Sequence, residues 1–224
     1  MALILTLNRK THRAFNRVRE NNFALEGLLG HTLHGKTAGI VGTGNIGMCM
    51  VKIFLGFGMK VIAYDVMHNP EFEKLGGTYR DNLKDLLSES HIVTLHVPLL
   101  ESTKHMINSE SIQLMRPGSI LVNTSRGALV EGKAIIEALK TKHLGGLAID
   151  VYENEEGLFF ANHEDEILYD DVIARLISFP NVLVTGHQGF FTVESLREIA
   201  VTTIDNLRRF EDGTECKNTL NGLM

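Results

Sequence analysis

Short runs rich in Val, Ile and Leu alternate with helical patterns along most of this 224-residue chain. Runs that are apolar at nearly every position predict strands buried on both faces, and parallel sheets join such strands through right-handed helical crossovers. Strands are predicted at residues 37–42, 60–65, 91–98, 119–124, 146–151 and 181–185. Helices are predicted at residues 46–56, 82–89, 109–115, 132–142 and 194–210. The order predicts an α/β fold with a Rossmann-type doubly wound parallel sheet.

Charge and cysteine content exclude several function classes. The chain has 22 basic and 27 acidic residues, a net charge of −5, which argues against nucleic acid as a partner. A basic run at residues 9–19 is interpreted as the solvent-exposed face of a helix rather than a binding site for a polyanion. Cys49 and Cys216 are too few for a disulfide framework, which favours a reducing, cytoplasmic location. The apolar start, residues 1–7, is too short to span a membrane, and no membrane role is predicted.

A glycine motif lies between the first predicted strand and the following helix. In GTGNIG, Gly42 permits a tight turn, Gly44 lets the backbone approach a pyrophosphate, and Gly47 lets helix and strand pack closely. The loop, including Asn45 and Ile46, would present a helix N-terminus to phosphates. A plain strand-to-helix turn is the alternative, and the strand–loop–helix context favours the dinucleotide site.

Asp65 ends the second predicted strand, 23 residues after Gly42. An acid about 20 residues beyond the glycine motif holds the ribose of NAD, and its charge would repel the 2′-phosphate of NADP. No arginine follows at positions 66–68 to receive such a phosphate. Taken alone, Asp65 is as well explained as a turn residue, but beside the glycine motif it predicts NAD as the cofactor.

Three titratable residues follow strands on the side where ligands bind in such sheets: Arg126, Glu155 and His187. A guanidinium binds a carboxylate through two hydrogen bonds, and an imidazole beside a carboxylate exchanges a proton near neutral pH. Together with NAD, this set predicts a redox reaction that interconverts a hydroxy acid and a keto acid. Each residue also has a structural alternative: a strand-end salt bridge for Arg126, membership of an acidic loop for Glu155, and a turn position for His187.

The other histidines and Cys49 offer no competing site. His91 and His96 are an odd number of residues apart on one predicted strand and point to opposite faces, which argues against a shared metal. His31 and His34 have no thiol or carboxylate nearby in the sequence, and Cys49 is interpreted as a structural thiol. No metal site is predicted.

The combination of motifs resembles the D-isomer-specific 2-hydroxyacid dehydrogenases, and within them the fermentative D-lactate dehydrogenases. It is carried by the segments GTGNIG, HVPLLEST, VNTSRGALV, DVYENEEGLFF and TGHQGF, together with a first helix that resembles the family's interdomain helix. The resemblance implies an NAD-dependent enzyme that interconverts D-lactate and pyruvate. The ENEEGLFF segment and the long acidic stretch from Glu153 to Leu176 resemble the D-lactate branch.

The resemblance also implies roles for individual residues. Arg126 would bind the substrate carboxylate, His187 would donate the proton in pyruvate reduction, and Glu155 would keep His187 charged. Phe190 would line the substrate pocket. Cofactor contacts are implied for Val97, Pro98, Thr103, Thr124, Ser125, Arg126 and Asp150.

The domain organisation expected from the resemblance is an interdomain helix at residues 1–22, an NAD-binding Rossmann domain at 23–188, and a C-terminal helical segment at 189–224. The last segment and the first helix would be remnants of a second, flavodoxin-like catalytic domain whose upstream part is expected to be missing. Leu3 and Leu7 would then be exposed unless another chain covers them, which predicts a homodimer. An NAD-binding sensor or interaction domain without turnover is the alternative function.

Overall fold

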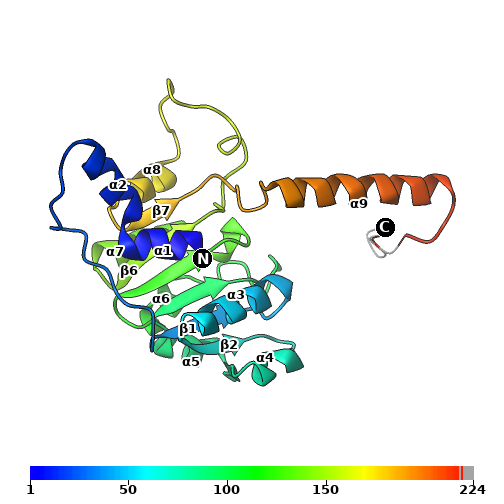
Figure 1. Cartoon of the computed structure of the whole chain (residues 1–224), viewed down its shortest axis with the longest axis horizontal. Helices are drawn as coiled ribbons and strands as arrows, with labels where there is room; N and C mark the ends of the chain where they lie inside the picture. Colours follow the sequence, from blue (N-terminus) through cyan, green and yellow to red (C-terminus); the bar gives the residue numbers. More distant parts are fainter. Residues whose placement is uncertain (217, 219–224) are drawn as a thin grey trace. The chain divides into compact units, whose positions relative to one another are not determined.

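The computed structural model describes residues 1–216 and 218, which fall into two units, Met1–Gly186 and His187–Met224. The first unit contains a parallel seven-stranded sheet in the order β3-β2-β1-β4-β5-β6-β7. Figure 1 shows the chain coloured along the sequence, from blue at the N-terminus to red. The sequence therefore predicted the fold class correctly. Within the described residues, no helix is long and apolar enough to cross a membrane.

The strands are short and nearly all agree with the predicted runs. They are β1 (Thr37–Val41), β2 (Lys60–Tyr64), β3 (Thr78–Tyr79), β4 (Ile92–Leu95), β5 (Ser119–Asn123), β6 (Leu144–Ile149) and β7 (Val182–Val184). Only β3 was not predicted, because two paired residues leave no periodic signal.

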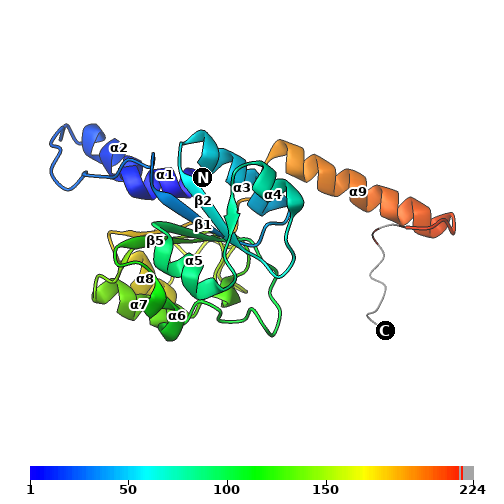
Figure 2. The same ribbon diagram turned by 90° about the horizontal axis from the view of Figure 1, so that it is seen from below.

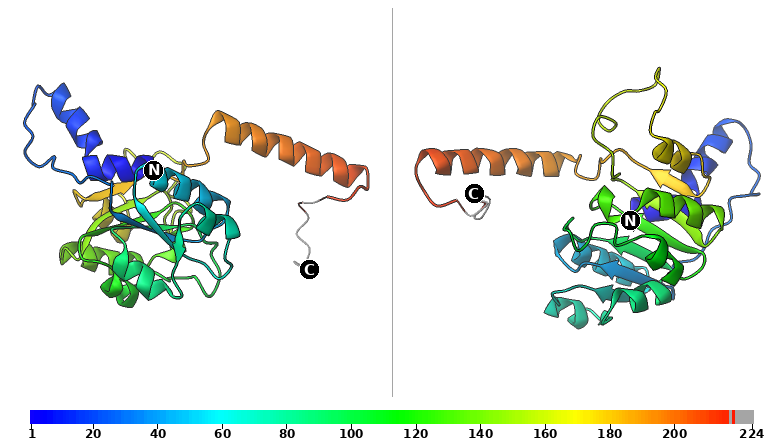
Figure 3. Two further views of the ribbon diagram at one scale, coloured as in Figure 1. Left: turned by 60° about the horizontal axis from the view of Figure 1, so that its bottom comes forward. Right: turned by 180° about the vertical axis from the view of Figure 1, so that it is seen from behind.

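The helices of the first unit cover both faces of the sheet. They are α1 (Ala2–Arg9), α2 (Thr11–Arg19), α3 (Asn45–Gly56), α4 (Pro70–Lys74), α5 (Leu83–Glu89), α6 (Ser109–Leu114), α7 (Gly132–Lys140) and α8 (Asp171–Ile177), with a short 3₁₀ turn at Gly127–Leu129. Figure 2 shows α1, α3 and α4 on one side and α5 to α8 on the other, and both views of Figure 3 show these layers. The arrangement is doubly wound, as predicted.

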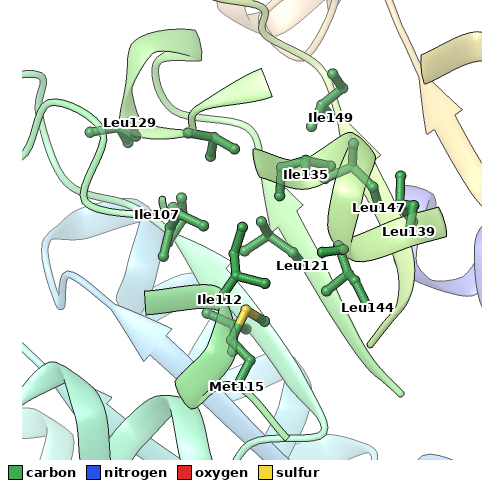
Figure 4. Packing of buried hydrophobic residues seen from close by; sticks show 14 of the residues in the cluster. Ile107, Ile112, Met115, Leu121, Leu129, Ile135, Leu139, Leu144, Leu147 and Ile149 are labelled. Carbon is green, nitrogen blue, oxygen red and sulfur yellow. The ribbon is translucent and has the colours of Figure 1, made fainter. Parts of the chain in front are cut away.

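Two apolar clusters lie on the two faces of the sheet. One packs α5 to α8 against strand residues such as Leu121 and Leu147. Figure 4 shows part of this cluster, with Ile112 of α6 and Ile135 of α7 beside these strand residues. The other packs α1, α3 and α4 against strand residues such as Ile40 and Val61. Alternate residues of each strand serve the two clusters, which is why the strand runs are apolar throughout.

The first helical region differs from the single helix that the sequence predicts. Lys10 adopts a left-handed conformation with φ 51° and separates α1 from α2. Ile4 and Leu7 of α1 are buried in the cluster with Ile40. The expectation that Leu7 needs a second chain to cover it is therefore wrong, since this unit's own sheet covers it. On α2, Phe15 and Val18 are exposed.

The second unit contains one long helix, α9 (Val193–Glu211), which is orange to red in Figure 1. Thr192 caps its first turn by accepting a hydrogen bond from the Ser195 N–H. Seven apolar side chains of α9 are exposed and none of its residues is buried: Val193, Leu196, Ile199, Val201, Ile204, Leu207 and Phe210.

Candidate active site

The glycine loop follows β1 at the point where the strand order reverses. From β1 the chain continues to β2 and β3 on one side, and β4 then pairs with β1 on the other, so a crevice is expected at their carboxyl ends. Gly42 has φ 99°, and a Cβ there would lie 2.6 Å from the His96 carbonyl oxygen just beyond β4. A Cβ on Gly47 would lie 2.0 Å from the Gly42 carbonyl oxygen. Both positions therefore require glycine for the loop to close.

Gly44 is glycine for a different reason. A Cβ built there meets no atom within 4 Å, and its φ is −68°, so nothing in the described chain excludes a side chain. Gly44 is the N-cap of α3, and no side chain caps this helix. Asn45 and Ile46 in the first turn are exposed, Ile46 at 65% of its area. An open backbone, uncapped N–H groups and an exposed apolar side chain fit a pyrophosphate with its attached nucleoside.

Asp65 follows β2 and its carboxylate is tied to the glycine loop. Oδ2 accepts hydrogen bonds from the Thr43 N–H (2.6 Å) and the Thr43 hydroxyl (3.0 Å), and Oδ1 accepts one from the Met67 N–H (3.1 Å). A carboxylate has about four acceptor positions, so Asp65 can still accept from a ribose hydroxyl. The structure thus gives Asp65 a part in shaping the loop that sequence reasoning did not find.

Tyr79 and Asn69 complete this network, and neither was a sequence candidate. The Tyr79 hydroxyl lies 2.7 Å from the Thr43 hydroxyl and accepts a hydrogen bond from the Asn69 N–H at 2.8 Å. The Asn69 amide donates to the Thr43 carbonyl oxygen (3.2 Å), and the ring of His68 stacks on Tyr79 at 3.8 Å. Tyr79 belongs to the two-residue strand β3, so only the tertiary structure brings it to the loop.

Arg80 is the one arginine next to this network in the chain, and it is already paired. Its guanidinium forms two hydrogen bonds of 2.6 Å with the Glu89 carboxylate. This pairing raises the pKa of Arg80 and lowers that of Glu89. Arg80 is thus not an unpaired cation that would receive a 2′-phosphate, in agreement with the expected preference for NAD.

The loops after β4 and β5 are held together by two hydroxyl groups. The Thr103 hydroxyl donates to the Pro98 carbonyl oxygen (2.7 Å) and accepts from the Leu100 N–H (2.8 Å), which closes the first loop. The Ser125 hydroxyl donates to the Val97 carbonyl oxygen at 2.7 Å and joins the second loop to it. Thr124, between β5 and Ser125, is exposed. The structure thus brings together the loop residues that the resemblance implied for the nicotinamide side.

Arg126 lies two residues further along the loop after β5 with its backbone fixed and its side chain exposed. The Asn123 amide donates to its carbonyl oxygen (2.8 Å), and its own Nη1 donates to the Ser125 carbonyl oxygen (2.7 Å). In the part of the chain that the structure describes, no carboxylate forms a salt bridge with it. The strand-end salt bridge is therefore not the role of this residue, and its guanidinium can bind an anion.

Glu155 is half-buried in the loop after β6, where Oε2 accepts a hydrogen bond from the Tyr152 N–H at 2.9 Å. This loop and the loop carrying Arg126 touch through their backbones. A Cβ on Gly127 would lie 2.0 Å from the Tyr152 carbonyl carbon. The glycine after Arg126 is therefore needed for the two loops to meet.

Asp150 follows β6 directly and is buried, with 5% of its area exposed. Its carboxylate accepts a short hydrogen bond from the Thr185 hydroxyl, and its N–H donates to the Asn123 carbonyl oxygen. These contacts fix Asp150 at the carboxyl ends of the central strands, where the resemblance implied a contact to the nicotinamide amide.

The acidic stretch that the sequence analysis singled out is anchored by Tyr152 and Asp170. The Tyr152 hydroxyl donates to both Asp170 oxygens at 2.9 and 2.8 Å, and Asp170 also caps α8. Burial and the Asp170 charge raise the pKa of Tyr152. Burial alone would raise the pKa of Asp170, but the hydrogen bonds it accepts hold it below the ordinary value. The stretch thus contains a capped helix that the sequence did not predict.

Two further histidines, His105 and His96, lie at this edge. The ring of His105, a residue with φ 48°, lies 2.7 Å from a Glu153 oxygen and joins the loop after β4 to the one carrying Glu155. Burial lowers the pKa of His96 to about 4, so its ring is neutral at pH 7 and is a poor proton donor. Sequence reasoning missed the His105–Glu153 pair, whose only signal is two titratable residues in the implied loops.

His187 is the first residue of the second unit and follows Gly186. Its backbone is left-handed, with φ 51°, and its ring lies edge-on to that of Phe190, with centroids 6.2 Å apart. Its convergence with Arg126 and Glu155 stays a prediction.

Residues 1–189 match the family model described as D-isomer specific 2-hydroxyacid dehydrogenase, NAD binding domain. The chain belongs to this family. The matched segment is the family's NAD-binding domain, and the glycine loop and Asp65 fit that cofactor, so NAD is the cofactor of this site.

Three relatives illustrate the similarity. The 2-hydroxyacid dehydrogenase A of Aspergillus oryzae is 57% identical over 220 residues, which is 98% of this chain and 63% of the relative. The pyruvate reductase of Chlamydomonas reinhardtii has a TM-score of 0.93 at 44% identity, over 97% of this chain and 66% of its own. The D-lactate dehydrogenase of Aquifex aeolicus, solved with NAD and lactic acid, has a TM-score of 0.87 at 37% identity, over 95% and 64%. The chain thus spans about two thirds of its relatives' length.

Proposed function

We propose that this chain is the cofactor-binding part of an NAD-dependent oxidoreductase that interconverts a D-2-hydroxy acid and a 2-keto acid, with D-lactate and pyruvate as the pair. The observation that carries the proposal is the guanidinium of Arg126, which has no carboxylate partner among the described residues and extends from a loop tied to the loops after β4 and β6. The relatives from Chlamydomonas reinhardtii and Aquifex aeolicus support the choice of pyruvate and lactate.

In this proposal, Arg126 holds the substrate carboxylate through two hydrogen bonds and polarises the carbonyl beside it. His187 donates the proton that the substrate oxygen needs on reduction. Glu155 is the carboxylate partner of His187, and a carboxylate beside an imidazole favours the protonated form. Bound NADH supplies the hydride.

The remaining proposed residues hold the cofactor. Gly42, Gly44, Asn45, Ile46 and Gly47 would receive the pyrophosphate, and Asp65 the adenine ribose. Val97, Pro98, Thr103, Thr124, Ser125 and Asp150 would surround the nicotinamide, and Phe190 would line the substrate pocket. The hydrogen bonds of Thr103, Ser125 and Asp150 support this role, because they fix the loops that would surround the nicotinamide.

The proposal includes the domain division into residues 1–22, 23–188 and 189–224, a cytoplasmic location and a homodimer. Two cysteines in 224 residues support the location. The exposed Phe15 and Val18 of α2, rather than Leu3 and Leu7, support a self-association surface at the first helical region.

The test is a stereospecific assay with pyruvate and NADH, run on this chain and on a form extended upstream to the length of its relatives. Stereospecific formation of D-lactate by the extended form is expected. If the extended form binds NADH but reduces only a bulkier keto acid, pyruvate is the wrong substrate. If it binds NADH and reduces no keto acid, the oxidoreductase proposal is wrong and a sensor role replaces it.

A further inference from the structure

A cavity of about 240 Å³ opens at the amino ends of β1, β4 and β5. The glycine loop lies at the carboxyl ends of the same sheet, so this cavity belongs to the opposite edge. Its polar lining includes Asn8, His31, Lys36, His91, Arg116 and Ser119. The proposed dehydrogenase function uses none of these residues.

The wall that carries Arg116 and Ser119 is a tight turn. The Ser119 N–H donates to the Arg116 carbonyl oxygen at 3.0 Å, Pro117 is the second residue of the turn, and Gly118 is the third with φ 79°. This sequence and geometry are typical of a type II turn. Arg116 and Ser119 are the first and last residues of this turn, and both line the cavity.

Ser119 is 2% exposed, and its hydroxyl has no hydrogen-bond partner among the described residues. A buried hydroxyl is normally hydrogen-bonded, and an exception calls for a reason. Ser119 lines the cavity, but its hydroxyl oxygen is itself buried, so Ser119 forms part of the wall and is not a donor that a ligand in the cavity can reach.

The charges around the cavity have one sign. Lys36, His91 and Arg116 line it, no acidic residue does, and in residues 1–216 and 218 none of the three forms a salt bridge. Burial lowers the pKa of His91, and the positive charges of Arg116 and Lys36 lower it further, which places both cations near the ring. The His91 Nδ1 accepts a hydrogen bond from the Thr37 N–H (3.1 Å), so in the neutral ring Nε2 carries the hydrogen and can donate it.

We propose that this cavity is a binding site for a small oxyanion of the phosphate type. Its donors are a guanidinium, an ammonium and an imidazole N–H, and an acceptor-rich anion can satisfy all three. Asn8 supports the wall by exchanging two hydrogen bonds with the backbone of His31, at 2.7 and 3.0 Å. The site is separate from the cofactor's phosphate loop and lies wholly within the first unit.

The test uses the full chain with saturating NADH, so that the glycine loop is filled, and compares inorganic phosphate with chloride at equal ionic strength. Phosphate is expected to raise the pKa of His91, followed by NMR of its ring and assigned with His91→Gln. Arg116→Gln should weaken phosphate binding at least about tenfold, which corresponds to one charge-assisted hydrogen bond. Lys84→Gln, which removes an exposed cation on α5, is the matched control and should leave the affinity unchanged.

Ser119→Ala is a second control. It removes an unpaired buried hydroxyl that the anion does not reach, so it should leave the melting temperature unchanged or raise it, and it should leave the rise that phosphate produces unchanged. Acetate and methyl phosphate distinguish the source of the anion: a preference for methyl phosphate over inorganic phosphate indicates a phosphorylated small molecule. Equal binding of acetate and phosphate, an unchanged His91 pKa, or equal effects of Arg116→Gln and Lys84→Gln would overturn the proposal. NADH binding in the same samples is read separately, so its failure is not mistaken for failure of this site.

Discussion

Gly42→Ala should lower the stability of the fold, whereas Gly44→Ala should lower the affinity for NADH, although the two glycines are two residues apart. At Gly42, alanine must adopt φ 99°, which costs about 1–3 kcal/mol. Its Cβ would also lie 2.6 Å from the His96 carbonyl oxygen, and relieving that overlap adds about 1–3 kcal/mol. The total is roughly 2–6 kcal/mol. For a chain of this size 1 kcal/mol shifts the melting temperature by about 2–4 °C, so the loss is at least about 4 °C.

At Gly44, alanine fits the chain without strain, because φ is −68° and no atom lies within 4 Å of the new Cβ. The loss of a favourable N-cap residue costs at most about 1 kcal/mol. The methyl group would, however, stand where the pyrophosphate approaches the backbone. NADH affinity should therefore fall at least about tenfold, or about 1.4 kcal/mol, while the fold stays intact.

Thermal unfolding followed by circular dichroism and titration of NADH fluorescence measure the two effects on the same samples. Gly76→Ala is the control for positive φ away from the loop: φ is 96° and the new Cβ would meet nothing within 4 Å, so only strain is added. The reasoning is refuted if Gly44→Ala lowers the melting temperature as much as Gly42→Ala does, or if it binds NADH as tightly as the parent chain.

Three further predictions concern charge. Asp65→Ser should narrow the preference for NADH over NADPH, measured by titration with both; an unchanged ratio would remove Asp65 from cofactor selection. In the extended, active form, His187→Ala should lower kcat about 10²–10⁴-fold, whereas Arg126→Gln should also raise KM for pyruvate; full kcat in His187→Ala would mean another proton donor. The lowered pKa of Asp170 contributes stability that is present above its unfolded pKa of about 4 and is lost as pH falls through the folded value. Tyr152→Phe removes part of that contribution, so it should flatten the decline of unfolding free energy in acid, and an identical pH profile would contradict the assigned hydrogen bond.

The sequence predicted the sheet well because its strands are buried on both faces. Runs such as residues 119–124 are apolar at nearly every position, and this pattern does not depend on how the individual side chains pack. The elements it missed lack such a pattern. The strand β3 has two residues and α4 has five, and the break at Lys10 falls in a polar run without glycine or proline to mark it.

The candidate site was predictable where backbone geometry demands a residue type, and less so where distant side chains meet. Gly42 and Gly47 are forced by contacts that recur with the motif, so the pattern identifies them. By contrast, Tyr79 reaches Thr43 across 36 positions, and His105 reaches Glu153 across 48. No local spacing encodes such pairs, and only the strand order brings them together.

Cofactor binding and proton donation depend on different parts of the chain. The loops after β4, β5 and β6 are joined within the first unit by the contacts Ser125–Val97, Gly127–Tyr152 and His105–Glu153. The cofactor side is therefore fixed by the sheet and by contacts between its own loops. His187, by contrast, opens the second unit in a left-handed conformation, which a residue other than glycine keeps only where its surroundings hold it. The proposed proton donor thus relies on structure outside the Rossmann sheet, and a chain can retain NAD binding while its chemistry depends on how that second unit is held.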